Sequence, residues 1–155
     1  TLMNILGRVP VIGKVIDKIA IQRFSGTLSS LLKAGVPIVN ALEITATSIN
    51  HQKMSAALVR VAQEGLSKGL SIGDSFKRET VFPASVTSLI TISEQSGSLD
   101  EVLATLSTFY DSEIESAIKT MVAFIEPALL VLIGFVVALI ALSIIVPVYQ
   151  LVGQF

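Results

Sequence analysis

Few residues in this sequence could carry out acid–base or metal chemistry. His51 is the only histidine, and the 155 residues include no cysteine. A histidine-based metal site or a Ser-His-Asp triad would therefore depend on one imidazole, which the local pattern places in the exposed first turn of a helix. We interpret His51 as an ordinary surface residue. The sequence predicts no catalytic residue, and the protein is not expected to be an enzyme.

A group of carboxylates lies later in the chain, at Asp111, Glu113 and Glu115, close to Lys119. Its simplest interpretation is a solvated helix face with one supporting ion pair between Glu115 and Lys119. A site for a divalent cation is the alternative. The glycines of GLSIG and GSL match neither a Walker A loop nor G-x-G-x-x-G, so no phosphate-binding loop is predicted. We expect no metal and no cofactor.

The composition and one apolar run indicate a membrane protein. Hydrophobic residues make up 52% of the chain and charged residues 15%, which is too apolar for an ordinary water-soluble domain. Between Pro127 and Pro147 lie 19 uncharged residues. At about 1.5 Å per residue, such a helix crosses a hydrocarbon core of roughly 30 Å. The alternative, a core helix of a soluble protein, would need more surrounding protein than this chain offers. We predict one transmembrane helix over residues 126–148.

The distribution of charge predicts how this helix is oriented. Lys119 and the many charges upstream precede the span, whereas no charged residue follows Glu126 as far as Phe155. The positive-inside bias then places the N-terminal body in the cytoplasm and the short tail, residues 149–155, in the periplasm. The formal net charge is −1 and no dense run of Lys or Arg occurs. Nucleic acid is therefore not an expected partner, whereas membrane lipid is.

The remaining residues predict an all-α fold, a cytoplasmic antiparallel bundle of about six helices, because turn signals recur and no segment keeps a period of two. Asn50 is the expected N-cap of the third helix, and Ser98 with Glu101 forms an expected capping box at the start of the sixth. Glycine and proline set most other ends. The expected segments are a lead-in over residues 1–13, a bundle over 14–125, a first helix from about Lys14 to Ala34, a second opened by Pro37, a loop-like stretch from Gly65 to Gly73, a brief helix from Ser71 to Arg78, and a fifth helix from Pro83 or Ala84 to Gly97.

The sixth helix and the transmembrane helix are expected to be one continuous rod. From Ser98 onward apolar residues recur at helical spacing, and no glycine occurs between Gly97 and Gly134. Pro127 lacks the N–H that would bond the carbonyl four residues earlier, so it should bend the rod, and Glu126 should lie at the membrane interface. We interpret the pair as a mechanical joint. The alternative is a simple boundary between an amphipathic and an all-apolar helix.

Three segments together resemble a known family. They are RFSGTLSSLLKAGVPIVNALEI, FPASVTSLITISEQSGSLDEVL and YDSEIESAIKTMVAFIEPALLVLIGFVV, followed by a final VP. In this order they resemble the F domain of type II secretion and type IV pilus platform proteins, in its second, C-terminal copy. One departure is Ser93, where the family usually has glycine. The resemblance carries the family pattern onto Gly35, Pro37, Pro83, Glu94, Gly97, Leu99, Glu113, Pro127 and Pro147.

The resemblance implies an inner-membrane assembly platform without chemistry of its own. Its implied partners are a hexameric cytoplasmic ATPase, pilins or pseudopilins, and other inner-membrane assembly proteins, and the family implies homo-oligomers, usually dimers. Glu94 is expected to make a polar contact, with either a neighbouring helix terminus or a partner protein; a solvated carboxylate is the alternative. Two other classes stay open, a transporter or channel fragment and a membrane-anchored enzyme, although Ser143 is the only polar side chain among the 19 residues between Pro127 and Pro147.

Overall fold

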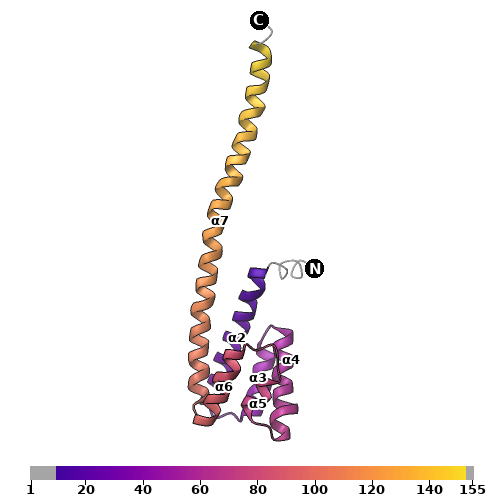
Figure 1. The fold of residues 1–155 in the computed structure, drawn as a ribbon, viewed down its shortest axis with the longest axis vertical. Helices are drawn as coiled ribbons and strands as arrows, with labels where there is room; N and C mark the ends of the chain where they lie inside the picture. Colours follow the sequence, from indigo (N-terminus) through magenta and orange to yellow (C-terminus); the bar gives the residue numbers. More distant parts are fainter. Residues whose placement is uncertain (1–9, 153–155) are drawn as a thin grey trace. The chain divides into compact units, whose positions relative to one another are not determined.

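The computed structural model describes residues 10–152 of the chain, and these are all-helical, as predicted (Figure 1). Parts of the expected lead-in and of the expected tail, residues 1–9 and 153–155, lie outside the described residues. The six α-helices of the described part are α2 (Pro10–Lys33), α3 (Ile38–Ser48), α4 (Gln52–Arg60), α5 (Ile72–Lys77), α6 (Ala84–Ser96) and α7 (Leu99–Val152); a π-helix (Val61–Gly65) and a 3₁₀ turn (Leu66–Lys68) follow α4.

Glycine and proline set most of the helix ends. Gly35 and Gly97 follow α2 and α6 in the left-handed conformation, with φ of 80° and 72°. The N–H groups of Val36 and Ser98 each donate to a carbonyl five residues earlier. A carbonyl at the end of each helix, which has no partner within the helix, thereby gains a hydrogen bond. Pro37 and Pro83 occupy the N-cap positions of α3 and α6. These ends agree with the sequence prediction.

Two predicted details are wrong. The N-cap of α4 is His51 rather than Asn50, because the ring Nδ1 accepts the Met54 N–H at 3.1 Å. The loop-like stretch expected from Gly65 to Gly73 is shorter than predicted: a 3₁₀ turn over Leu66–Lys68 directly follows the π-helix, Gly69 ends it at a φ of 88°, and residues 69–71 lead into α5, the brief helix expected there. A glycine inside the helical pattern suggested a break, but here it allows a close helix contact.

The capping box expected at the start of α7 does not form, because the Ser98 hydroxyl has a different partner. The Ser98 hydroxyl lies 2.6 Å from the Ser96 hydroxyl, and within the described residues it does not accept the Glu101 N–H. The Ser98 carbonyl accepts the Val102 N–H at 3.1 Å, so α7 still begins at the predicted place.

Three phenylalanines form the centre of the core. Phe24 of α2, Phe76 of α5 and Phe82 before α6 have ring centroids 5.0 to 5.6 Å apart, in tilted or edge-on contact. Such pairs stabilise a fold beyond the area that they bury. Phe24 and Phe76 are fully buried. The short α5 is therefore part of the core and not a surface connection.

The short α5 packs unusually closely between its neighbours. A Cβ on Gly73 would lie 2.5 Å from the Thr91 hydroxyl of α6 and 3.0 Å from the Thr91 Cα. A Cβ on Gly65 would clash with the side chain of Ser75. Glycine is required at both positions because the helix backbones themselves approach each other. Neither contact was predicted.

The chain divides into two compact units, residues 1–115 and 116–155. Within the first unit, the beginning of α7 closes the core with Leu103, Leu106 and Tyr110, and the Ser29 hydroxyl of α2 donates to the Asp100 carbonyl at 2.8 Å. The second unit is the rest of α7, which remains helical through Pro127 and Pro147. The predicted continuity of the last helix is thus confirmed, whereas the bend at Pro127 stays a prediction.

Substituting Gly97 tests the left-handed helix end. Apart from Gly97 and its two chain neighbours, no heavy atom of the described residues lies within 4 Å of the place where a Cβ on Gly97 would stand, so any loss of stability comes from the backbone conformation. We expect Gly97→Val to lower the free energy of unfolding of the bundle by at least about 1 kcal/mol. Gly97→Asn is the control, since asparagine tolerates this conformation, and should lose clearly less. Urea unfolding of the chain in detergent, followed by circular dichroism, measures both; equal stability of Gly97→Val and the wild type would contradict the assignment.

Candidate functional site

The Glu94 carboxylate joins the last turn of α6 to the start of α5. Its two oxygens accept the N–H groups of Ile72 and Gly73, at 2.6 and 2.8 Å. These donors belong to the first turn of α5 and have no partner within that helix, and a negative charge is favourable there. Ser71 caps the same turn through a 3.1 Å bond from the Asp74 N–H. The contact is with a neighbouring helix terminus, the first of the two contacts expected from the sequence. We call it the Glu94 clamp.

The geometry of the Glu94 clamp depends on small residues around it. Gly73 is buried and lies against Thr91, one turn before Glu94 on α6, so the two helices are close enough for both carboxylate bonds. Ser93 is also buried, with its hydroxyl donating to the Ile90 carbonyl at 2.9 Å. A serine therefore fits where the family pattern has glycine. Gly97 then turns the chain from α6 into α7.

The other predicted positions within the bundle lie at helix ends or against the core. Gly35, Pro37 and Pro83 lie at helix ends, as described above, and Leu99 is half-buried against the core. Within the described part of the chain, none of these four residues is hydrogen-bonded to a residue of the Glu94 clamp. Their roles in any interaction remain predictions.

Glu113 pairs with a residue that the sequence analysis did not single out. Its carboxylate lies 2.8 Å from the Lys18 ammonium of α2, and both side chains are partly exposed. Tyr110, one turn earlier on α7, is buried. The pKa of Tyr110 is raised above its usual value, mainly because the side chain is buried. The nearby Lys18 charge opposes this shift, and the Glu113 charge adds to it. The pair connects α2 with α7 near the end of the first unit, and an exposed ion pair of this kind adds little stability.

His51 has more defined surroundings than a plain surface histidine. Its Nδ1 accepts the Met54 N–H and its Nε2 lies 3.1 Å from the Asp17 carboxylate of α2. Its side chain is 16% exposed. The ring therefore contacts the first turn of α4 through one nitrogen and α2 through the other. The interpretation as an ordinary surface residue is therefore wrong, because His51 caps α4 and links it to α2. Groups of three or more histidine, aspartate or glutamate side chains that could hold a metal do not occur in residues 10–152.

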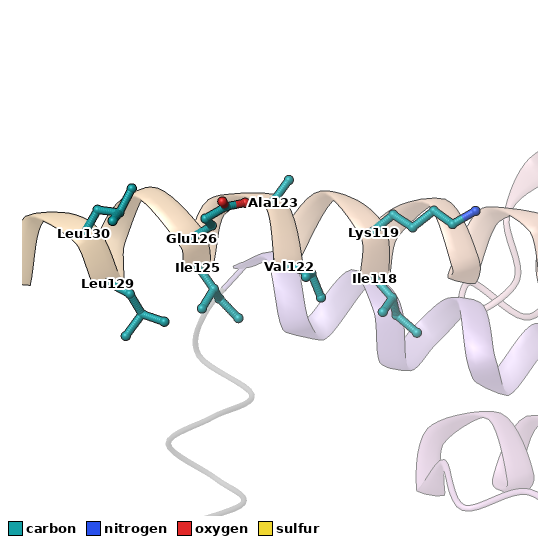
Figure 2. Close-up of a pocket in the computed structure, with 8 residues that line it drawn as sticks. All are labelled: Ile118, Lys119, Val122, Ala123, Ile125, Glu126, Leu129 and Leu130. Carbon is teal, nitrogen blue, oxygen red and sulfur yellow. The ribbon is translucent and has the colours of Figure 1, made fainter.

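Glu126, Pro127 and Pro147 lie on α7 in the second unit and are exposed. A shallow groove lies along this part of the helix, and Figure 2 shows the side chains that line it. Ile118, Val122, Ile125 and Leu129 project toward one side of the helix in this view, and Lys119, Ala123, Glu126 and Leu130, each one position further along the chain, lie toward the other side. We call residues 118–130 the α7 collar. The arrangement contains one carboxylate, at Glu126, among mostly apolar side chains.

By length and composition, α7 could cross a membrane. It is the one such helix in the described part of the chain, with a mean hydropathy of 3.3 in its most apolar window and none of that window buried. An all-helical bundle whose last helix continues as an exposed apolar helix is the architecture of a membrane-attached helical domain.

Comparison with known proteins identifies the family. The family model of type II secretion system protein F matches residues 24–147, so the chain belongs to the type II secretion system protein F family.

Relatives carry names from two machineries. The type IV pilus assembly protein PilC of Myxococcus xanthus is 34% identical over 93% of this chain and 34% of its own length. PilC of Thermus thermophilus is 34% identical over 94% of this chain and 36% of its own length, and type II secretion system protein F of Pseudomonas aeruginosa has the same three values. The chain thus spans about a third of the length of these relatives.

Removing the Glu94 carboxylate should weaken the bundle. Glu94→Ala leaves the buried Gly73 N–H and the Ile72 N–H without their acceptor, so we expect the free energy of unfolding to fall by about 2 kcal/mol. Glu94→Gln, which retains one acceptor oxygen, should lose less. Gln95→Ala is the matched control, because Gln95 is the exposed neighbour on α6, and it should change stability by less than about 0.5 kcal/mol. If Glu94→Ala unfolds at the same urea concentration as Gln95→Ala, the clamp does not stabilise the bundle.

Proposed function

We propose that this protein is part of the inner-membrane platform that assembles type IV pili or the pseudopili of type II secretion. The proposal rests on family membership, since the family model of type II secretion system protein F matches most of the chain. Relatives named for pilus assembly and for secretion are equally similar, at 34% identity. The two machineries are therefore not distinguished by similarity.

The proposed role is mechanical rather than catalytic. We infer that the bundle is the surface on which a hexameric cytoplasmic ATPase acts, and that α7 carries the resulting motion into the bilayer, where pilins or pseudopilins are handled together with other inner-membrane proteins. Homodimers of the whole protein belong to the same proposal. Two features support it: the bundle is held by close backbone contacts at Gly65 and Gly73, and α7 continues from it without a break.

The proposed location is the bacterial inner membrane, with the bundle in the cytoplasm and the C-terminus in the periplasm. The support is the charge distribution, because no charged residue follows Glu126. In this orientation the bundle is on the side where ATP is available to a motor.

Pro127 is proposed as the joint between the bundle and its membrane anchor. A proline inside a helix removes one backbone hydrogen bond and crowds the preceding turn, so the helix bends more readily there. A hinge at this position would let the bundle tilt against its anchor with little repacking.

A complementation experiment tests the function and the joint together. A strain lacking the gene should lose pilus or pseudopilus assembly, and the full-length protein should restore it. Full-length Pro127→Ala should fold normally, since it regains a backbone hydrogen bond, and yet restore assembly more slowly by at least about threefold. Pro147→Ala is the matched control, because it makes the same change near the far end of the span and should assemble at the wild-type rate. Assembly that is normal without the gene would overturn the function; normal assembly by Pro127→Ala would reduce Pro127 to a boundary between two kinds of helix.

A further inference from the structure

Two rows of side chains along α2 differ in their chemistry. Ile21, Phe24 and Leu28 form one row and are buried in the core. The second row has the same helical spacing of three and four and contains no apolar side chain; it consists of Lys18, Gln22, Ser25 and Ser29. We call these four residues the polar row. Three of them bond to α7, so α2 meets the first turns of α7 with polar groups.

The bonds from the polar row hold the start of α7 more firmly than its next turns. The bond to the Asp100 carbonyl, in the first turn of α7, is short at 2.8 Å. The Gln22 amide donates to the Ser107 hydroxyl at 3.5 Å, which is beyond the usual range for a hydrogen bond. The pair of Lys18 and Glu113 is partly exposed on both sides and adds little stability. These contacts therefore fix the first turn of α7 and constrain the following turns weakly.

Ser25 contributes a buried hydroxyl without a partner to the polar row. Its side chain is fully buried, and its Oγ makes no hydrogen bond within the described residues. The hydroxyls of Ser30 and Thr45, in contrast, donate to the carbonyl four residues earlier in their own helices. Burying a hydroxyl without a partner is unfavourable. The observed position of α7 thus leaves one hydrogen bond unmade in its contact with α2.

The Ser107 hydroxyl lies next to the part of α2 that carries Ser25. The Gln22 amide is 3.5 Å from it, and a Cβ on Gly26 would be 2.9 Å from it. Ser25 lies between these two residues along the helix and faces the neighbouring sector of its surface. Gly26 has no side chain that would block a sideways movement of Ser107. A small displacement of α7 could therefore bring the two serine hydroxyls together.

The displacement needed is of the size that packed helices undergo. Ser107 lies seven residues beyond Asp100, or about 10 Å along the helix. A tilt of α7 by about 10° around its first turn would move the Ser107 hydroxyl by about 2 Å, and helix shifts of about 1–2 Å occur without loss of packing. The apolar side chains of α7 in the core can keep their neighbours in such a movement.

We propose that the beginning of α7 has two positions against α2. In the observed position the Ser107 hydroxyl accepts from the Gln22 amide; in the second, α7 is tilted around its first turn and the Ser25 hydroxyl donates to Ser107. This tilt would give the bundle a movement of its own, separate from the proposed joint at Pro127. All the residues involved belong to the first unit, so the second position depends neither on the membrane crossing nor on the assembly role.

Fluorine NMR of the full-length protein in lipid nanodiscs tests the proposal. The probe is 3-fluorotyrosine at Tyr110, a buried residue of α7 that follows Ser107 by three positions. We expect relaxation dispersion from two exchanging environments, with the minor one populated at about 1–10%. Ser25→Ala removes the bond of the second position and should lower the minor population at least about fivefold. Gln22→Ala removes the bond of the observed position and should raise the minor population about twofold.

Two further proteins complete the test. Ser30→Ala is the matched control, because the Ser30 hydroxyl bonds within α2, and it should leave both populations unchanged. Gly26→Cys combined with Ser107→Cys identifies the observed position: the two Cβ atoms would be 3.7 Å apart, which suits a disulfide. This chain has no other cysteine, and any cysteine elsewhere in the full-length protein is replaced by serine. The oxidised protein should show the major environment without dispersion.

Three results would overturn the proposal. They are a single environment in the wild type, as expected if an internal water satisfies Ser25, a minor population that is the same in Ser25→Ala and Ser30→Ala, and a fall of that population in Gln22→Ala. The spectra are recorded without pilus or pseudopilus assembly. A negative result therefore contradicts the second position of α7 alone, and failed complementation contradicts the assembly role alone.

Discussion

The bundle depends on the position of one short helix, α5, which could not hold its place by itself. A helix of six residues has too few internal hydrogen bonds to be stable alone. Three contacts hold it: Phe76 packs between Phe24 and Phe82, Gly65 and Gly73 allow close approach on two sides, and Glu94 accepts the first two N–H groups. Because α5 touches α2, the π-helix and α6 through these contacts, the same three interactions also fix the relative positions of their neighbours.

A second constraint acts on α7, which must suit two environments. Its first turns bury Leu103, Leu106 and Tyr110 in the bundle, whereas residues beyond Ser116 expose apolar side chains on every side. A helix that is apolar all round is stable only when lipid or protein surrounds it. The exposed apolar surface therefore requires lipid or protein around it, and the proposed membrane crossing of α7 would supply these surroundings.

The local features of the fold could be predicted from the sequence, and the contacts between distant residues could not. Gly97, Pro37 and Pro83 act on the backbone within a few residues of themselves, so their effect on helix ends follows from their chemistry alone. The pairing of Lys18 with Glu113 joins residues far apart in the chain and depends on how α2 packs against α7. His51 was misjudged for the same reason, since its partner Asp17 comes from another helix. Gly65 suggested a loop because a glycine usually weakens a helix, whereas here the missing side chain makes room for Ser75.

We propose that α7 crosses the inner membrane with the bundle in the cytoplasm, where a motor can act on it. The most direct test is a pair of fusions to the full-length protein, one with alkaline phosphatase after Phe155 and one with green fluorescent protein at the same position. Alkaline phosphatase is active only in the periplasm, and green fluorescent protein exported unfolded through the membrane does not fluoresce. With this orientation, the phosphatase is expected to be active and the fluorescent protein to be dark. An inactive phosphatase with a bright fluorescent protein would place Phe155 in the cytoplasm and contradict it.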